Sequence, residues 1–219
     1  MSGLTEFQTE VARLFFSLPA SDGFLLAGGG ALLASGLTTR PTEDLDFFGE
    51  RGRSNVVAVR DQLEAAATER GWTVTRLHTS ESYVRVQLTG VTDLLVDIAI
   101  DASASHPPVV SIVGPTFEPE ELAGRKLIAL FDRAEARDFA DVYVLAQRFG
   151  RELLLARAAE IDLGFDHRVL ASMMRTLDRF TDDELPIGAE DIQVIRAFFR
   201  HWADELDRPQ HPSVHPRCE

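Results

Sequence analysis

Two aspartates, Asp44 and Asp46, lie one residue apart inside the otherwise apolar stretch EDLDFF. Side chains alternate between the two faces of a strand, so a strand here would point both carboxylates to one face. Both stay ionised when a cation lies between them, and oxygen ligands favour Mg²⁺ or Mn²⁺. Asp97, the only charge in LLVDIAI, is the third candidate ligand, and Asp101, which directly follows that run, is the alternative. The sequence therefore predicts a site for a divalent cation.

Three consecutive glycines, Gly28, Gly29 and Gly30, follow the apolar run FLLA. A strand, a glycine turn and a helix N-terminus present backbone N–H groups to an anion, and Gly28 and Gly29 would let phosphates approach closely. With the carboxylates, this indicates metal-assisted phosphoryl or nucleotidyl transfer from a nucleoside triphosphate to an acceptor hydroxyl. Each part has a plainer interpretation: a simple turn, surface alternation in a strand, or a core carboxylate at Asp97. Their order and spacing favour the site.

The elements that must hold these residues follow from hydrophobic periodicity. We expect strands over 24–27, 43–48, 72–78, 83–89 and 93–100, and helices over 5–18, 31–36 and 54–71, the last with a serine cap. Segment 101–119 contains four prolines and marks a change of pattern. After it we find only helical periodicity, over 120–133, 138–150, 151–161, 166–180 and 189–206.

The expected fold is therefore an α/β N-terminal lobe with a mixed sheet, followed by an all-helical C-terminal lobe. We place the α/β lobe at residues 1–115, the helical lobe at 116–208 and a mobile tail at 209–219.

Composition limits the classes of partner. The 219-residue chain is 45% hydrophobic, as globular proteins are, and its net charge of −13 opposes general adhesion to nucleic acid. A nucleic-acid partner would need a local basic patch. No apolar run is long enough to span a membrane and the N-terminus lacks a signal-peptide pattern, so we expect a cytoplasmic protein without membrane contact. The single cysteine, Cys218, fits a reducing compartment.

Lys126 is the only lysine among 22 basic residues. Such a bias is typical of a GC-rich genome, in which arginine replaces lysine wherever the two are interchangeable. Lys126 then marks either a position that needs a compact ammonium or a chance survivor.

Two segments, GGGALLASGLTTRPTEDLDFF and ELAGRKLIALFDRAEARDFADVYVL, together with FFRHW near the end, resemble the AbiEii/AbiGii-type nucleotidyltransferase toxins of the polymerase-beta-like superfamily. The resemblance covers most of residues 20–205. It implies a bilobal enzyme that holds a nucleotide between its lobes. Gly30 departs from the serine or threonine that family members often have there.

The resemblance also implies roles for individual residues. Asp44 and Asp46 match metal ligands, and Lys126 matches a lysine that contacts triphosphate. We expect catalytic roles for Asp44, Asp46, Lys126 and Asp138, metal binding by Asp44, Asp46 and Asp97, and nucleotide contacts from Gly28, Gly29, Gly30, Arg40, Thr42, Lys126, Arg133, Arg137 and Asp141. Alternatively, Asp138 only caps a helix, and Arg133 and Arg137 line a solvated helix face.

The function we expect is Mg²⁺- or Mn²⁺-dependent transfer of a nucleoside monophosphate from an NTP to the 3′ end of tRNA, by the toxin of a toxin–antitoxin or phage-defence system with a cognate antitoxin as partner. One alternative is nucleotidylation of a protein or small molecule, which the acidic composition favours. An alternative of another class is a catalytically silent nucleotide- or antitoxin-binding module. A tRNA acceptor would require a basic patch, for which Arg40, Arg125, Arg133 and Arg137 are the candidates.

Overall fold

The computed structural model describes residues 3–188 and 190–208. Its strands form one seven-stranded mixed sheet in the order β3-β4-β5-β2-β1-β7-β6. The pairs β2·β5 and β1·β7 are parallel and the other pairs are antiparallel. The strands are β1 (Phe24–Ala27), β2 (Asp44–Glu50), β3 (Thr73–Thr79), β4 (Tyr83–Thr89), β5 (Asp93–Asp101), β6 (Val109–Val110) and β7 (Pro115–Thr116). The expected mixed sheet is confirmed.

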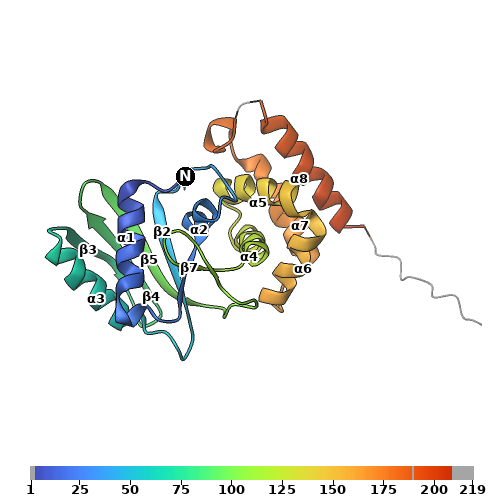
Figure 1. Ribbon diagram of the computed structural model, residues 1–219. Helices are drawn as coiled ribbons and strands as arrows, with labels where there is room; N and C mark the ends of the chain where they lie inside the picture. The colour runs from blue at the N-terminus through green and yellow to red at the C-terminus, as the bar shows by residue number, and fades with distance from the viewer. Residues whose placement is uncertain (1–2, 189, 209–219) are drawn as a thin grey trace, which may run out of the picture.

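The first three helices alternate with strands along the chain, and the later helices follow one another without strands between them. The first three are α1 (Glu6–Ser17), α2 (Gly28–Ala34) and α3 (Val56–Glu69). From residue 119 the described elements are all helical: α4 (Pro119–Asp132), α5 (Ala136–Phe149), α6 (Arg151–Ile161), α7 (His167–Arg175) and α8 (Ile192–Leu206). Short 3₁₀ turns lie at Pro19–Ser21, Thr176–Arg179 and Asp182–Glu184. Figure 1 shows α1 and α3 on the strand side of the molecule and α5 to α8 together on the other side, with α2 and α4 between them.

The strand that carries the two aspartates is fixed from its opposite face. Leu45 and Phe47 are fully buried, and the ring of Phe47 stacks on Phe15 of α1 with 3.7 Å between centroids. A shift of one residue would move these apolar side chains to the opposite face of the sheet and turn the carboxylates into the core. Packing on α1 therefore sets which way the carboxylates point.

Several elements differ from the sequence prediction at their ends, and three of these differences have a clear local description. The helix expected over 54–71 is capped by Asn55, whose side chain accepts from Ala58 N, because the hydroxyl of Ser54 accepts from Glu50 N instead. The helix expected over 31–36 begins at Gly28, so the glycines form its first turn. The helix expected over 166–180 ends at Arg175 and continues as a 3₁₀ turn.

The proline-rich segment 101–119 also contains the short strands β6 and β7, which we did not expect. Leu26 of β1 pairs with Thr116, whose hydroxyl donates to the carbonyl of Leu26 at 2.8 Å. The sheet thus reaches one residue past the expected lobe boundary at 115. The expected tail, 209–219, lies outside the described residues.

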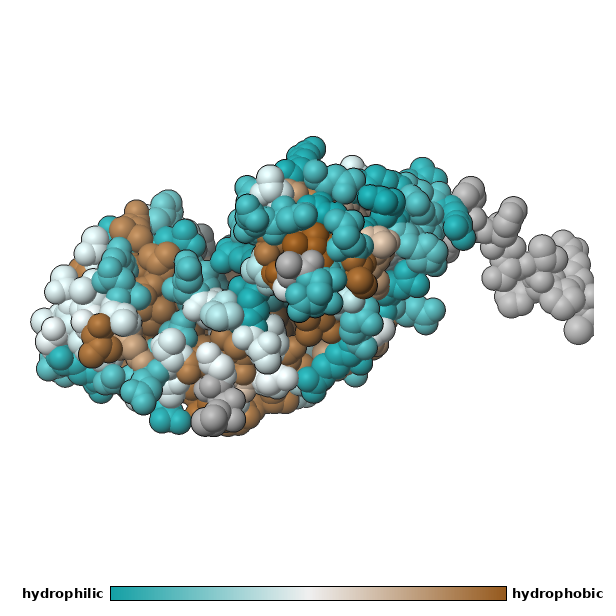
Figure 2. Space-filling model, turned by 90° about the horizontal axis from the view of Figure 1, so that it is seen from above, coloured by the Kyte–Doolittle hydropathy of each residue, from teal (hydrophilic) through white to brown (hydrophobic). Residues whose placement is uncertain are grey.

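The surface is mostly polar. Seen from above, polar residues cover much of the molecule, and apolar residues show on both the strand side and the helical side (Figure 2). Within the described part of the chain, we find no helix with the length and apolar character that a membrane crossing requires.

Candidate active site

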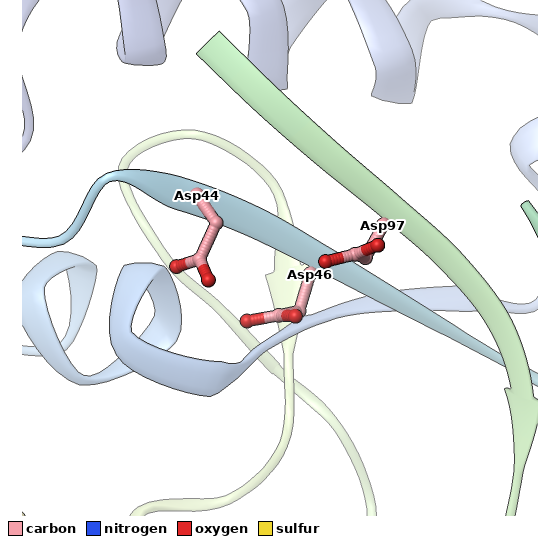
Figure 3. Close-up of side chains that lie close together, drawn as sticks. All are labelled: Asp44, Asp46 and Asp97. Atoms are coloured by element: carbon pink, nitrogen blue, oxygen red, sulfur yellow. The ribbon is translucent and has the colours of Figure 1, made fainter. Parts of the chain in front are cut away.

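Asp44, Asp46 and Asp97 form a compact carboxylate cluster. Each offers an oxygen atom, and these three oxygens lie within 4.8 Å of one another. Asp44 and Asp46 come from β2 and Asp97 from the neighbouring parallel strand β5, where it is the register partner of Asp46 (Figure 3). Asp101 lies at the far end of β5 and pairs with Arg125 at 3.2 Å. The structure therefore brings Asp97 rather than Asp101 to the other two carboxylates.

Asp44 and Asp46 have different electrostatic environments. Burial and the negative charge of Asp44 raise the pKa of Asp46 to about 7. Burial acts in the same direction on Asp44, but the Thr42 hydroxyl, which donates to Asp44 at 2.7 Å, and the guanidinium of Arg137 at 3.2 Å together lower the pKa of Asp44. In the absence of a cation, Asp46 is therefore the carboxylate that keeps a proton near neutral pH.

The glycines make room for these side chains. Gly28 has a φ of +60°, and a Cβ on it would lie 1.7 Å from Oδ2 of Asp46. A Cβ on Gly29 would lie 2.6 Å from the Thr42 hydroxyl. Both glycines line the cavity described below. Gly30 is buried against Leu45 and is not among the described residues that line this cavity. The first two glycines thus allow the backbone to approach the carboxylates closely.

Lys126 and Arg40 share one buried carboxylate, Asp141. Nζ of Lys126 lies 2.8 Å from Oδ2 of Asp141, and Arg40 donates to both carboxylate oxygens at 2.8 Å. Burial opposes ionisation of Asp141, but the two cations hold its pKa below the usual value. Asp141 therefore holds the two cations at the wall of the cavity.

Asp138 is fully buried and faces Arg133. It accepts from Arg133 Nε at 3.0 Å and Nη2 at 3.1 Å, and from the backbone N–H of Glu135 in a capping box at the start of α5. Asp138 is not among the described residues that line the cavity introduced below. The structure thus gives Asp138 both a capping contact and an ion pair that fixes Arg133.

Arg137 links the second motif to the first. Its guanidinium lies 3.2 Å from Asp44 and 2.9 Å from Glu135. It therefore faces the carboxylate cluster.

Our reading of the sequence missed two side chains of β4, Tyr83 and Arg85. Arg85 donates to both oxygens of Asp97 at 2.7 Å, and the Tyr83 hydroxyl donates to the same carboxylate at 2.7 Å. Burial and this hydrogen bond raise the pKa of Tyr83 to about 12, so it remains a donor. The alternation in YVRVQLT puts both on one face, and a buried carboxylate needs a partner, so this pairing had a visible signal.

Glu121 and Arg125 form a second contact that our sequence analysis did not predict. Glu121 is fully buried and accepts from Arg125 and from the backbone N–H groups of Ser105 and His106. Arg125 also donates to the carbonyl oxygens of Ala102 and Ser103. Arg125 therefore fastens the segment after β5 to α4, and its donors are largely used.

A cavity of about 390 Å³ brings these groups together. Its charged lining consists of six cations, Arg40, Arg85, Arg125, Lys126, Arg133 and Arg137, and four carboxylates, Asp44, Asp46, Asp97 and Asp101. The whole chain, by contrast, carries a net charge of −13. The lining thus concentrates positive charge around an acidic cluster.

The cations differ in accessibility. The side chains of Arg40, Arg125 and Lys126 are 15%, 10% and 9% exposed. Those of Arg85, Arg133 and Arg137 are 41%, 45% and 38% exposed. The cavity therefore has an inner cationic wall and an outer cationic rim.

The residues fit a divalent cation. Carboxylate oxygens are the donors that Mg²⁺ and Mn²⁺ prefer, and three converge at the cluster. The missing side chain at Gly28 leaves room for the Asp46 carboxylate, whose Oδ2 would lie 1.7 Å from a Cβ at that position. With cations nearby, the arrangement can hold a metal-bound polyphosphate.

Comparison with known proteins also indicates a nucleotidyltransferase. The family profile described as "Nucleotidyl transferase AbiEii toxin, Type IV TA system" matches residues 12–214. No curated protein sequence gives a significant match.

Three solved structures share the fold. JHP933 from Helicobacter pylori is 18% identical, with a TM-score of 0.53 and 93% of each chain covered. A putative nucleotidyltransferase from H. pylori is also 18% identical, with a TM-score of 0.54 and coverage of 94% of this chain and 100% of that one. MenT4, a nucleotidyltransferase toxin from Mycobacterium tuberculosis H37Rv, is 13% identical, with a TM-score of 0.54 and coverage of 92% and 82%. The fold is therefore nucleotidyltransferase-like.

Proposed function

Since the chain belongs to the AbiEii family of nucleotidyltransferase toxins, we propose that it transfers a nucleoside monophosphate from an NTP to the 3′ end of tRNA. The observation that carries this proposal is the cavity in which three carboxylates are surrounded by six cationic side chains. A nucleoside triphosphate with its metal needs both kinds of group. A catalytically silent module would not need the carboxylate cluster.

In this proposal the inner wall binds the triphosphate. Lys126 and Arg40, both held by Asp141, supply fixed positive charge, and Gly28 and Gly29 let the phosphates approach the backbone. The nucleotide then lies between the sheet and α4, and we propose that these belong to two lobes, residues 1–115 and 116–208, except that Thr116 pairs within the sheet. An acceptor hydroxyl oxygen forms a bond to the α-phosphorus as the bond to the diphosphate breaks.

Asp44, Asp46 and Asp97 would hold Mg²⁺ or Mn²⁺. When bound, the ion neutralises charge on the triphosphate and makes the acceptor hydroxyl a better nucleophile. Thr42 fixes the orientation of Asp44, and its own carbonyl is held by the Gln8 side chain at 2.7 Å.

The outer rim supports a polyanionic acceptor. Arg85, Arg133 and Arg137 are the more exposed cations of the cavity, and they lie where a substrate too large to enter would meet it. Arg125, which we expected in the basic patch, is occupied by Glu121 and the segment after β5. The proposed tRNA contact therefore rests on the rim rather than on Arg125.

The family is described as a toxin of a type IV toxin–antitoxin system. We accordingly propose that the protein acts in the cytoplasm as the toxin of such a pair and that a cognate antitoxin protein counteracts it.

The test is to incubate the protein with Mg²⁺, each α-³²P-labelled NTP in turn, and total tRNA or total cell protein. We expect label on tRNA, and we expect prior periodate oxidation of the tRNA 3′ end to abolish it. Asp46→Ala should remove the activity, whereas Asp183→Ala, at an exposed acidic position, should not. Label on protein or a small molecule would refute the tRNA acceptor, and absence of transfer to any acceptor would refute the enzyme assignment at this site.

A further inference from the structure

Arginine side chains form ion pairs with two of the three carboxylates in the cluster. Arg137 donates to Asp44 at 3.2 Å, and Arg85 donates to both oxygens of Asp97 at 2.7 Å. Asp46 lies between these pairs, and no described side chain donates a hydrogen bond to it. The cluster is thus partly neutralised by the protein itself, from α5 on one side and β4 on the other.

A metal ion and these guanidinium groups need the same oxygens. Oδ1 of Asp97 already accepts from Tyr83 and Arg85, and Oδ2 accepts from Arg85. A divalent cation within a few ångströms of a guanidinium is also repelled by it, strongly so where water is scarce. Simultaneous occupation is therefore unfavourable.

The two arginines are able to leave. They belong to the exposed rim of the cavity, and their long side chains can reorient without opening the core. Lys126 and Arg40 differ, because they face the buried Asp141, which lies outside the cluster. Arg85 and Arg137 are therefore the two cationic side chains that a metal ion would have to displace from its ligands.

We propose that Arg85 and Arg137 act as exchangeable counter-ions that hold Asp97 and Asp44 until a divalent cation displaces them. The inference rests on the proposed function, because it takes the cluster as the metal site. Entry of the cation frees two guanidinium groups inside the cavity, where they can bind substrate phosphates. Metal binding and the supply of phosphate-binding cations are then one event.

The test is direct titration with Mn²⁺ alone, following the free ion by EPR, on the full-length protein without nucleotide. The variants are Arg85→Gln, Arg137→Gln and the double variant. Arg133→Gln is the matched control, because Arg133 lies on the same rim and loses the same charge but pairs with Asp138, which is outside the cluster. Asp46→Asn, which removes a ligand, identifies the site.

We expect each single variant to bind Mn²⁺ roughly fivefold more tightly than Arg133→Gln, since that factor corresponds to about 1 kcal/mol of relieved competition. The double variant should show both gains together, because the arginines hold different carboxylates. If neither variant binds Mn²⁺ more tightly than the control, the exchange is refuted while the metal site stands, provided that Asp46→Asn weakens binding. If neither the parent protein nor the double variant binds Mn²⁺, the metal site and the exchange both fail.

Discussion

Asp46 should make the stability of the metal-free protein depend on pH. Its pKa rises from 3.8 to about 7 in the folded state, so the folded protein holds this proton more tightly than the unfolded chain. The resulting stabilisation is complete below about pH 4 and is lost as the pH rises through about 7. The difference of about three pKa units corresponds to roughly 4 kcal/mol, an upper limit because Asp44 shares the titration.

Replacing Asp46 with asparagine removes the ionisation and keeps the shape of the side chain. The free energy of unfolding of Asp46→Asn should exceed that of the parent by up to roughly 4 kcal/mol at pH 8.5 and by less than half of that at pH 5. Urea unfolding in EDTA at the two pH values measures the difference. The control is Asp183→Asn, which removes an exposed carboxylate and should change stability by about 0.5 kcal/mol or less.

Divalent cation gives a second check. We expect Mg²⁺ to bind the folded parent and to reduce the advantage of Asp46→Asn at pH 8.5, because ligand binding to the native state adds to its stability. Parallel pH profiles for the parent and Asp46→Asn would refute the reasoning. An equal gain in Asp183→Asn would refute it as well, because the effect would then reflect overall charge.

Three other expectations follow from the site. Lys126→Arg should lower nucleotidyl transfer by ~100-fold despite keeping the charge, because the larger planar group cannot take the place of the buried ammonium; unchanged turnover would make the lysine replaceable. Gly36→Ala should lower the free energy of unfolding by about 1 kcal/mol, because alanine is strained at the positive φ of this position. Gly28→Ala should lower it by at least roughly 1 kcal/mol more, because its Cβ also collides with Asp46 whereas Gly36 has open space. Equal shifts in urea midpoint would contradict this. Binding of tRNA should weaken steeply with salt, and Arg133→Ala should lower the log–log slope by about one; a flat salt dependence would favour a small acceptor.

Several elements were predictable from local pattern in the sequence. The alternating strand at 83–89, the apolar run at 24–27 and the helix at 151–161 have the predicted bounds. The strands β6 and β7 were not predicted, because two residues carry no period. In addition, β7 joins the sheet through Leu26, ninety positions away in the chain, and β6 pairs only with β7. The start of the helix at Gly28 was not predicted, because glycine disfavours helix. Glycine is needed at this position because a Cβ there would collide with the Asp46 carboxylate.

Local pattern also located part of the site. The spacing of Asp44 and Asp46 predicted a shared face, and the structure places them in one cluster. The choice of Asp97 over Asp101 depends on the register of two parallel strands, which single-sequence patterns do not encode. The contact of Arg85 with Asp97 needs the pairing of β4 with β5, although alternation in YVRVQLT already put Tyr83 and Arg85 on one face. Glu121 and Arg125 are four residues apart in α4, so their spacing was a local signal, whereas the contact of Arg125 with the carbonyl of Ala102 depends on packing between elements.

Asp141 also limits how the cavity can open. This one carboxylate on α5 binds Lys126 on α4 and Arg40 in the loop that leads into β2, so both walls are fastened at the same buried point. Separating them would leave unpaired charges, at a cost of several kcal/mol. Glu121 and Arg125 fasten α4 to the segment after β5 in the same way, so we expect the cavity to open at the arginine rim, where the contacts are more exposed.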